Sequence, residues 1–373
     1  MANLLSTYTA SRNNNFNLVR FMAASLVLFS HSFALALGSG DAEPLRSTIG
    51  MTWGTIAVDV FFITSGFLIT KSYLSSNNII AFWWARILRI YPALIVAILF
   101  CVFCVGTWFT TNSLNEYLQD PQTYKYLIKN STLFFGIEFD LPGVFMNTPY
   151  KEAVNGSLWT LPYEVKMYVI LAFTLGLAVR ISRWVKFASI RNTILFIAIL
   201  STSIHIANHF QPILSIKSTR LFSLFFVGAV FYLCRDKIYL STKWTLFLLP
   251  LLLVSSVNKD VFFVIYSLSL PFIIFYISYV PAGEIRKFNK FGDYSYGIYI
   301  YAFPVQQSIA ATLPNVSVPI MIALSFLITF LLSMLSWHLI EKRFLKMKDS
   351  YVFIGTFVRY IGLKTRLVRA KNH

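Results

Sequence analysis

The chain has 373 residues, of which 57% are hydrophobic, 17% are aromatic and only 13% are charged. Ordinary soluble domains carry about a quarter charged residues, so this composition excludes a soluble globular protein and indicates an integral membrane protein. The formal net charge is +17, but the basic residues lie between apolar segments, which indicates the positive-inside asymmetry of a membrane protein and not a nucleic-acid-binding surface.

The first predicted transmembrane span is FNLVRFMAASLVLFSHSFALAL, residues 16–37. It is long enough to cross a hydrocarbon core of about 30 Å, yet Arg20 and His31 interrupt it. An ionisable residue inside a spanning helix is costly and by default indicates function. Because eleven residues make about three helical turns, both side chains share one face, roughly 16 Å apart along the axis. We expect both to look into one cavity.

Further apolar segments follow this span, so the sequence predicts an all-α integral membrane protein with about ten transmembrane helices around a central cavity. The expected spans are residues 16–37, 53–74, 87–109, 157–179, 192–208, 220–234, 243–257, 260–280, 293–311 and 317–340. With the N-terminus inside, most of the 32 Lys and Arg residues fall on the inner side. This asymmetry predicts that both termini are cytoplasmic.

Two segments outside the spans have distinct expectations. The outer connection 110–156 is too long for a plain turn, so we expect a partly ordered lid with short helices around residues 115–130. Residues 1–345 then form one transmembrane domain and residues 346–373 a basic cytoplasmic tail, which we expect to lie on anionic lipid headgroups. The basic residues of the tail's distal part are Arg359, Lys364, Arg366, Arg369 and Lys371.

Arg86 and Arg89, in WWARILRIYP, begin the third span. Residues three apart occupy neighbouring positions on one helix face, and the planar guanidinium fork suits phosphate oxygens. Together with Arg20, three cations could converge on one ligand. The alternative for the pair alone, flanking arginines that extend to lipid headgroups, stays open.

Five side chains are candidates for chemistry or substrate contact. A neutral imidazole such as His31 is suited to take a proton from a hydroxyl, although an interior histidine can also be purely structural. Asp59, in the second span, either orients His31 or pairs with a cation. Glu164 is a base partner, a substrate ligand or half of an ion pair. Trp159 and Tyr163 either belong to the interfacial aromatic belt or stack on a sugar ring.

The remaining histidines are interpreted as structural and not catalytic residues. His205 and His209 have the i, i+4 spacing of a possible metal pair, but no carboxylate is close in sequence, so we interpret them as interface or acceptor-contact residues. His338 and Glu341 end the last span. For them we expect helix-end hydrogen bonds and a salt bridge with Lys342 or Arg343.

Six segments occur in a recognisable order: RFMAASLVLFSH, GTIAVDVFFITSGFLIT, RILRIYPAL, NGSLWTLPYEVKMY, FGDYSYGIYIYAFPV and IEKRF. In this order they resemble the membrane acyltransferase type 3 family of bacterial cell-envelope enzymes, over about residues 14–345. Each motif is weak by itself, but their order and the predicted topology make the resemblance specific. One departure is Ala302, where many members have His; Tyr299 or Tyr301 stands in for it, or the role is absent.

The resemblance implies ten spans and the transfer of an acyl group, usually acetyl, from cytoplasmic acyl-CoA to a sugar hydroxyl at the outer face. The essential Arg and His of the family correspond to Arg20 and His31, and its RxxR motif to Arg86 and Arg89. Its SLWxLxxE segment corresponds to Ser157, Leu158, Trp159, Leu161 and Glu164.

We therefore expect a multi-pass O-acetyltransferase of the bacterial inner membrane. The donor is acetyl-CoA and the acceptor a cell-surface polysaccharide (O-antigen, capsule or exopolysaccharide) or its lipid-linked precursor. We expect membrane lipids as neighbours, and no bound cofactor, metal or nucleic acid; the oligomeric state is open. The expected residues are His31, Asp59 and Glu164 for catalysis, Arg20, Arg86 and Arg89 for acyl-CoA, and Ser157, Trp159 and Tyr163 for the acceptor.

The alternative function is a transporter or flippase of an envelope glycolipid. In that case the arginines bind a pyrophosphate and His31 relays protons. Transporters tend to show inverted repeats and helices broken at mid-membrane. The sequence has no clear repeat, which counts mildly against this alternative.

Overall fold

The computed structural model describes residues 3–11, 13–76, 78–181 and 189–351. Within these residues the chain is almost entirely helical, and its only sheet is one antiparallel pair of two-residue strands, β1 (Asn3–Leu4) and β2 (Tyr239–Leu240). The predicted all-α fold is therefore confirmed. Most of the expected basic tail, from residue 352 onward, lies outside the described residues.

Ten long helices of the described chain occupy the ten expected spans. They are α2 (Phe16–Leu37), α4 (Trp53–Ser75), α5 (Ile79–Phe100), α9 (Thr160–Ile181), α10 (Ile190–Phe210), α11 (Ile216–Leu233), α12 (Thr242–Ser255), α13 (Lys259–Tyr279), α14 (Ser295–Thr312) and α15 (Val318–Ser336). Seven helical segments of the described residues are long and apolar enough to cross a membrane, as expected for a multi-pass membrane protein. Helices α9, α12 and α14 fall short in length or hydropathy.

Short helical elements connect and extend the long ones. The α-helical pieces are α1 (Leu5–Thr9), α3 (Arg46–Ile49), α6 (Thr107–Phe109), α7 (Leu114–Gln119), α8 (Pro121–Thr132) and α16 (Lys342–Lys346). The 3₁₀ segments are η1 (Gly40–Ala42), η3 (Gly156–Trp159), η4 (Gly283–Lys290) and η6 (Met347–Ser350). Two π-helical turns, η2 (Cys101–Gly106) and η5 (Trp337–Glu341), continue α5 and α15.

Helices α7 and α8 lie where short helices were expected in the connection 110–156. Ser113 caps α7 in a capping box with Glu116, which satisfies two backbone donors at the helix start. Asp120 caps α8, and Pro121 occupies its first turn, where a missing N–H costs nothing. Local sequence therefore accounts for both helices.

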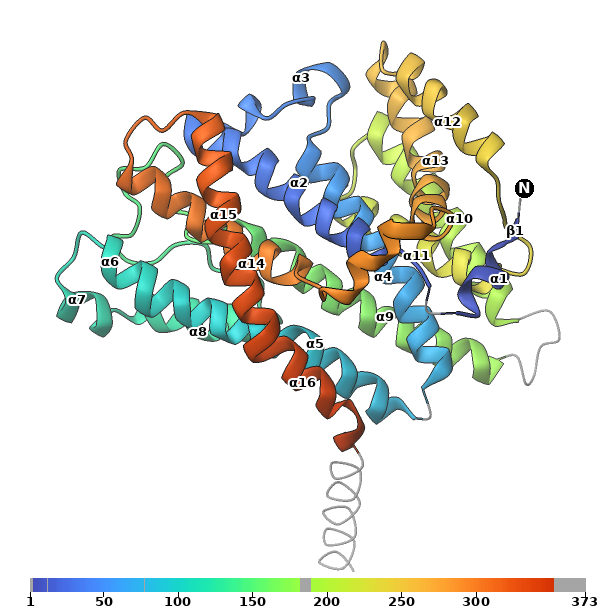
Figure 1. Ribbon diagram of the computed structural model, residues 1–373, viewed down its shortest axis with the longest axis horizontal. Helices are drawn as coiled ribbons and strands as arrows, with labels where there is room; N and C mark the ends of the chain where they lie inside the picture. Colours follow the sequence, from blue (N-terminus) through green and yellow to red (C-terminus); the bar gives the residue numbers. More distant parts are fainter. Residues whose placement is uncertain (1–2, 12, 77, 182–188, 352–373) are drawn as a thin grey trace, which may run out of the picture.

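Helix α4 lies at the centre of the bundle, where it packs against α2 and α11, while α14 packs against α2 and α15 (Figure 1). Two glycines let α4 and α11 approach closely. A β-carbon on Gly66 would lie 1.9 Å from the carbonyl oxygen of Phe225, and one on Gly228 would lie 2.1 Å from the carbonyl oxygen of Ile63. Small residues at such a crossing are typical of membrane helix packing.

We expect the substitution Gly66→Ala to destabilise the bundle. The added methyl group meets backbone and not a movable side chain, so the helices must separate, at a cost of about 1–3 kcal/mol. The control is Gly176→Ala in α9, where the nearest heavy atom would be the Tyr73 hydroxyl at 3.4 Å. Thermal unfolding of both variants in detergent is the measurement. Equal melting temperatures for the two would contradict the close crossing.

Candidate active site

Three cavities follow one another along α2. The arginine cavity, of about 510 Å³, is lined by the first turns of α2 and by α4, α5 and the end of the chain's described part. The middle cavity, of about 30 Å³, holds only a water or two. The histidine cavity, of about 710 Å³, is lined by the last turns of α2 and by the connection 110–156. Arg20 lines the first two and His31 lines the third.

The arginine cavity brings Arg20, Arg86 and Arg89 together, the convergence considered from their positions near the inner ends of two predicted spans. Arg89 is bound by two acids: it donates to Asp293, and its Nη1 lies 3.4 Å from an Oε atom of Glu341. The Nε atom of Arg20 lies 4.0 Å from the same carboxylate of Asp293. Convergence of the three cations is thus observed, whereas their binding of phosphate stays a prediction.

Asp293 and Glu341 were not predicted as members of this site. Asp293 lies in the turn before α14 and is fixed by the hydroxyl group of Ser295. The expectation that Glu341 pairs with the basic residues directly after it is wrong. Glu341 is only 2% exposed; it pairs with Arg89 and accepts a 3.0 Å hydrogen bond from Ser336. Its π-helical turn directs it inward, a feature that hydrophobic periodicity does not reveal.

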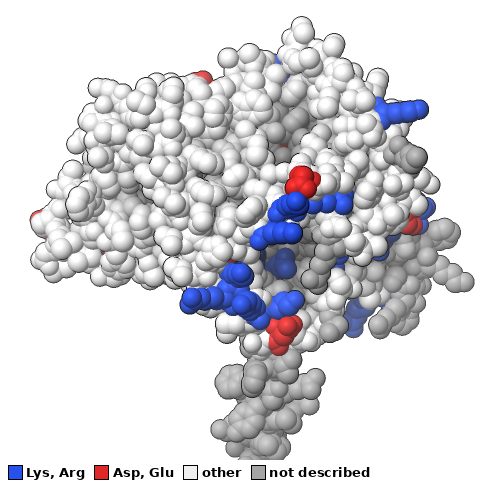
Figure 2. All heavy atoms as spheres, viewed as in Figure 1, with Lys and Arg blue, Asp and Glu red and all other residues white. Residues whose placement is uncertain are grey.

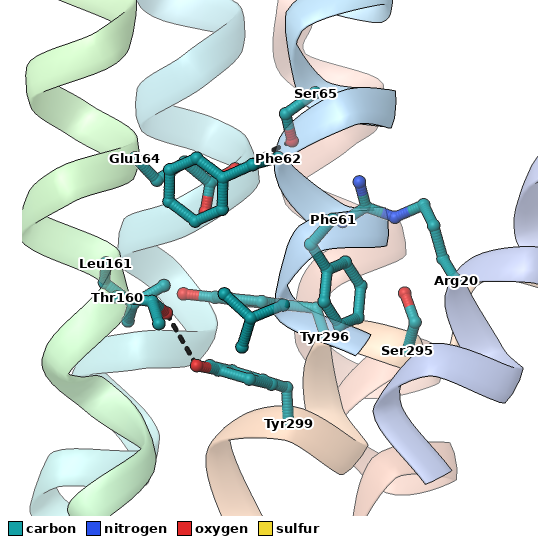
Figure 3. Close-up of a pocket in the computed structure, with 11 residues that line it drawn as sticks. Arg20, Phe61, Phe62, Ser65, Thr160, Leu161, Glu164, Ser295, Tyr296 and Tyr299 are labelled. Atoms are coloured by element: carbon teal, nitrogen blue, oxygen red, sulfur yellow. Dashed lines mark hydrogen bonds between the residues drawn. The ribbon is translucent and has the colours of Figure 1, made fainter. Parts of the chain in front are cut away.

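Figure 3 shows the middle cavity, with Arg20 on one side and Glu164 across from it. Glu164 accepts hydrogen bonds from Tyr168 and, at 3.4 Å, from Ser65, and it also lines the arginine cavity. It does not line the histidine cavity. Among the roles considered for Glu164, this position favours contact with substrate or charge balance for the arginines over direct support of His31.

A pair of hydroxyl groups marks one side of the middle cavity, joined by the dashed line in Figure 3. The Thr160 and Tyr299 oxygens lie 2.6 Å apart, and the Tyr299 hydroxyl donates to the carbonyl oxygen of Ser157 at 2.8 Å. The middle and histidine cavities share no lining residue. The prediction of one continuous cavity is therefore corrected: Arg20 and His31 line separate cavities with a constriction between them.

The histidine cavity places His31 beside an acid that was not predicted. The ring of His31 packs edge-on against Phe303, with centroids 5.5 Å apart, and its buried Nδ1 has no hydrogen-bond partner. Glu43 lines the same cavity and accepts a hydrogen bond from Ser30, the residue before His31. Glu43 is therefore a candidate partner of the imidazole.

The chain reversal after α2 explains why Glu43 lies there. Gly38 ends α2 with a positive φ of 80°, and a β-carbon on it would lie 2.9 Å from the carbonyl oxygen of Pro149. The segment that follows can therefore fold back under the connection 110–156. The only sequence signal was an acid shortly after the first span, which does not distinguish Glu43 from Asp41.

Asp59 does not contact His31. It is fully buried, its Oδ1 lies 3.2 Å from Nε of Arg220, and its Oδ2 accepts a 2.8 Å hydrogen bond from Tyr266. It lines none of the three cavities. The alternative interpretation, pairing with a cation, is the observed one, and a catalytic role for Asp59 stays a prediction. The ion pair joins α4 to α11, and the hydrogen bond from Tyr266 adds α13.

Of the three residues predicted to bind the acceptor, Trp159 lines the histidine cavity, where Nζ of Lys217 lies 4.8 Å from its ring centre. Tyr163 packs edge-on against Trp159 and lines none of the three cavities. Ser157 is buried, and its hydroxyl oxygen has no hydrogen-bond partner. Position therefore supports Trp159 as an acceptor contact, whereas acceptor binding by Tyr163 and Ser157 stays a prediction.

The connection 110–156 forms a wall of the histidine cavity through residues 139–140 and 149–153. Gln307 of α14 holds this wall, because its Nε2 donates 2.7 Å hydrogen bonds to the carbonyl oxygens of Tyr150 and Ala153. The segment expected to be a lid is thus anchored to the bundle beside His31.

His205 and His209 contact neighbouring helices, as expected for interface residues. The ring of His209 stacks on Phe263 at 3.8 Å, and its Nε2 lies 2.8 Å from Asp260. His205 packs edge-on against the same phenyl ring.

We expect Glu43→Gln to lower kcat by about tenfold or more, the effect of losing roughly 1.4 kcal/mol of charge stabilisation at the imidazole. The amide keeps the shape of the side chain, so KM for the donor should change little. Glu152→Gln, on the same cavity wall, is the matched control. The measurement is steady-state acyl transfer by both variants; identical rates would exclude Glu43 as the partner of His31.

Comparison with known proteins gives consistent matches. A family model described as an acyltransferase domain matches residues 13–338. A protein of Shigella phage Sf6 named O-acetyl transferase is 33% identical over 350 residues, covering 90% of this chain and 96% of the phage protein. Nodulation protein 10 of Rhizobium leguminosarum bv. viciae is 28% identical over 231 residues, 60% of each chain. O-acetyltransferase OatA of Staphylococcus aureus is 24% identical over 328 residues, covering 78% of this chain and 52% of OatA. No solved structure matches significantly.

Proposed function

Because the chain belongs to the acyltransferase type 3 family, we propose that it is an O-acetyltransferase of the bacterial inner membrane. It moves an acetyl group from cytoplasmic acetyl-CoA to a sugar hydroxyl of a cell-surface polysaccharide (O-antigen, capsule or exopolysaccharide) or its lipid-linked precursor. The observation that carries the proposal is the placement of Arg20 and His31 on one helix, in large cavities on either side of a narrow constriction.

The arginine cavity is the proposed donor site. Its guanidinium groups suit the phosphate oxygens of a nucleotide, and its volume of about 510 Å³ is in the range of small-molecule sites. The positive-inside distribution of Lys and Arg supports a cytoplasmic position for this cavity, the side on which acetyl-CoA is found. The thioester arm then extends along α2 toward the middle cavity.

The histidine cavity is the proposed acceptor site. A ring nitrogen of His31 takes the proton of the sugar hydroxyl, the hydroxyl oxygen attacks the thioester carbonyl, and the CoA thiolate leaves. In the second route a ring nitrogen of His31 attacks the thioester carbonyl, the CoA thiolate leaves, and the sugar hydroxyl then attacks the acyl-imidazole and releases the imidazole. In both routes Glu43 stabilises the positively charged imidazole. Trp159 offers a ring face for the sugar.

The constriction between donor and acceptor sites must open for transfer. The hydroxyl pair of Thr160 and Tyr299 is the contact that we expect to break, because both side chains line the middle cavity. A narrow passage suits an acetyl group and not a whole glycolipid. No observation therefore favours the transporter alternative.

The proposed function is tested with purified protein in lipid nanodiscs, supplied with acetyl-CoA labelled in the acetyl group and with surface glycan from the source cell. The expected result is labelled glycan together with an equal amount of free CoA thiol. A control reaction omits the glycan. Movement of glycolipid across the bilayer without any release of CoA would support the transporter and overturn the proposal.

A further inference from the structure

The end of the described chain forms part of the arginine cavity. Trp337, Leu345 and Lys348, from η5, α16 and η6, all line it. This C-terminal segment is held against α5, beside which α16 lies in Figure 1. The indole N–H of Trp84 donates a 3.0 Å hydrogen bond to the carbonyl oxygen of Met347. Lys348 therefore has a fixed backbone next to α5, which carries Arg86 and Arg89.

The cations of this cavity differ in how far they are already neutralised. Arg89 contacts two acids, and Arg20 approaches Asp293. Among residues 3–11, 13–76, 78–181 and 189–351, neither Arg86 nor Lys348 forms an ion pair with a carboxylate. Arg86 makes one long hydrogen bond, 3.4 Å, to Ser72, and its buried Nε has no hydrogen-bond partner.

The depths of these two cations also differ. Arg86 is partly buried, whereas Lys348 is exposed. On the face shown in Figure 2, most basic side chains gather in two groups beside a hollow, one of them over α16. Exposed basic residues of the two elements nearest these groups are Lys287 and Lys290 of η4, and Lys342, Arg343, Lys346 and Lys348 of the C-terminal segment. An anion is therefore attracted to this mouth and meets Lys348 before Arg86.

We propose that Lys348 and Arg86 form a two-part phosphate site at the mouth of the arginine cavity, and that Lys348 binds the ribose phosphate of coenzyme A. The inference rests on the proposed function. Coenzyme A carries a diphosphate next to the pantetheine arm and a separate phosphate on the ribose. With the arm directed inward, the diphosphate faces Arg86 and the ribose phosphate faces Lys348. Arg89, whose charge is already balanced, mainly holds Asp293 and Glu341 in place.

Phosphate groups also occur on anionic lipid headgroups, so the experiment separates the two sources. Full-length protein in phosphatidylcholine nanodiscs, which lack anionic lipid, is titrated with coenzyme A and with 3′-dephospho-coenzyme A. We expect wild-type protein to bind coenzyme A more tightly. Lys348→Gln should weaken coenzyme A binding by about fivefold, as for an exposed ion pair, and leave binding of the dephospho form unchanged. Lys346→Gln, two residues away and outside the cavity lining, should leave both unchanged.

Each other outcome has a defined meaning. If Lys348→Gln discriminates between the two ligands as well as wild type does, the assignment of Lys348 is overturned. If it loses only binding of phosphatidylglycerol, measured in nanodiscs containing that lipid, the lysine serves a headgroup and the inference is also overturned. If wild-type protein binds neither form of coenzyme A, the proposed donor fails, and the inference fails with it. Unchanged melting temperatures verify that both variants are folded.

Discussion

Replacing His31 with alanine is expected to reduce the rate of acetyl transfer by roughly 10²- to 10⁴-fold, the usual contribution of a positioned general acid–base group. The reason is chemical and not structural. His31 faces a cavity, its Nδ1 makes no hydrogen bond, and its ring contact is the edge of Phe303. Removing the imidazole therefore removes few packing contacts. The measurement is single-turnover transfer from labelled acetyl-CoA to glycan by purified protein.

The control for this prediction is His209→Ala. His209 also lies near the end of a long helix and packs against a phenyl ring, that of Phe263, but it does not line the histidine cavity. We expect the His209 variant to keep nearly normal transfer. Wild-type rates in a folded His31→Ala protein would exclude the imidazole from the mechanism. They would also exclude Glu43 as its stabilising partner.

The largest expected effect on stability is that of Arg89→Gln. The guanidinium group pairs with both Asp293 and Glu341, and the Glu341 side chain is only 2% exposed. Removing one partner of a buried ion pair costs about 3–5 kcal/mol, because the remaining charge stays uncompensated. We expect a large fall in the melting temperature in detergent, and a loss of folded protein during purification.

Two further variants test whether uncompensated charge is the cause. The double variant Arg89→Gln with Glu341→Gln removes one of the stranded carboxylates, so part of the lost stability should return. Arg191→Gln breaks a pair with Asp236 whose side chains are 41% and 60% exposed, and such pairs contribute little. If Arg89→Gln and Arg191→Gln unfold at the same temperature, the arginine is not a buried anchor.

Much of this fold could be predicted because long apolar segments leave few alternatives to membrane-spanning helices. Helices α2, α4 and α13 begin and end within a residue or two of the predicted spans. That Arg86 and Arg89 lie on one face of α5 was also predictable, since helix geometry fixes which residues of a helix share a face. These predictions depend only on local spacing along one helix at a time.

The parts that could not be predicted depend on contacts between segments far apart in sequence. Glu43 reaches the His31 cavity only through the chain reversal at Gly38. Asp59 pairs with Arg220, a residue 161 positions later (220 − 59). The sequence around either residue does not indicate which residue it pairs with. Asp293 belonged to a recognised motif, but its role as the shared anion of two arginines required the position of α14 relative to α2 and α5.

The narrow middle cavity has a consequence for the energetics of the cell. A passage through a membrane that maintains a proton gradient would dissipate the gradient if it stayed filled with a continuous column of water. Room for only a water or two beside Thr160 and Tyr299 interrupts such a column while the enzyme is idle. Under the proposed function, an acetyl group can thus cross the membrane without making it permeable to protons.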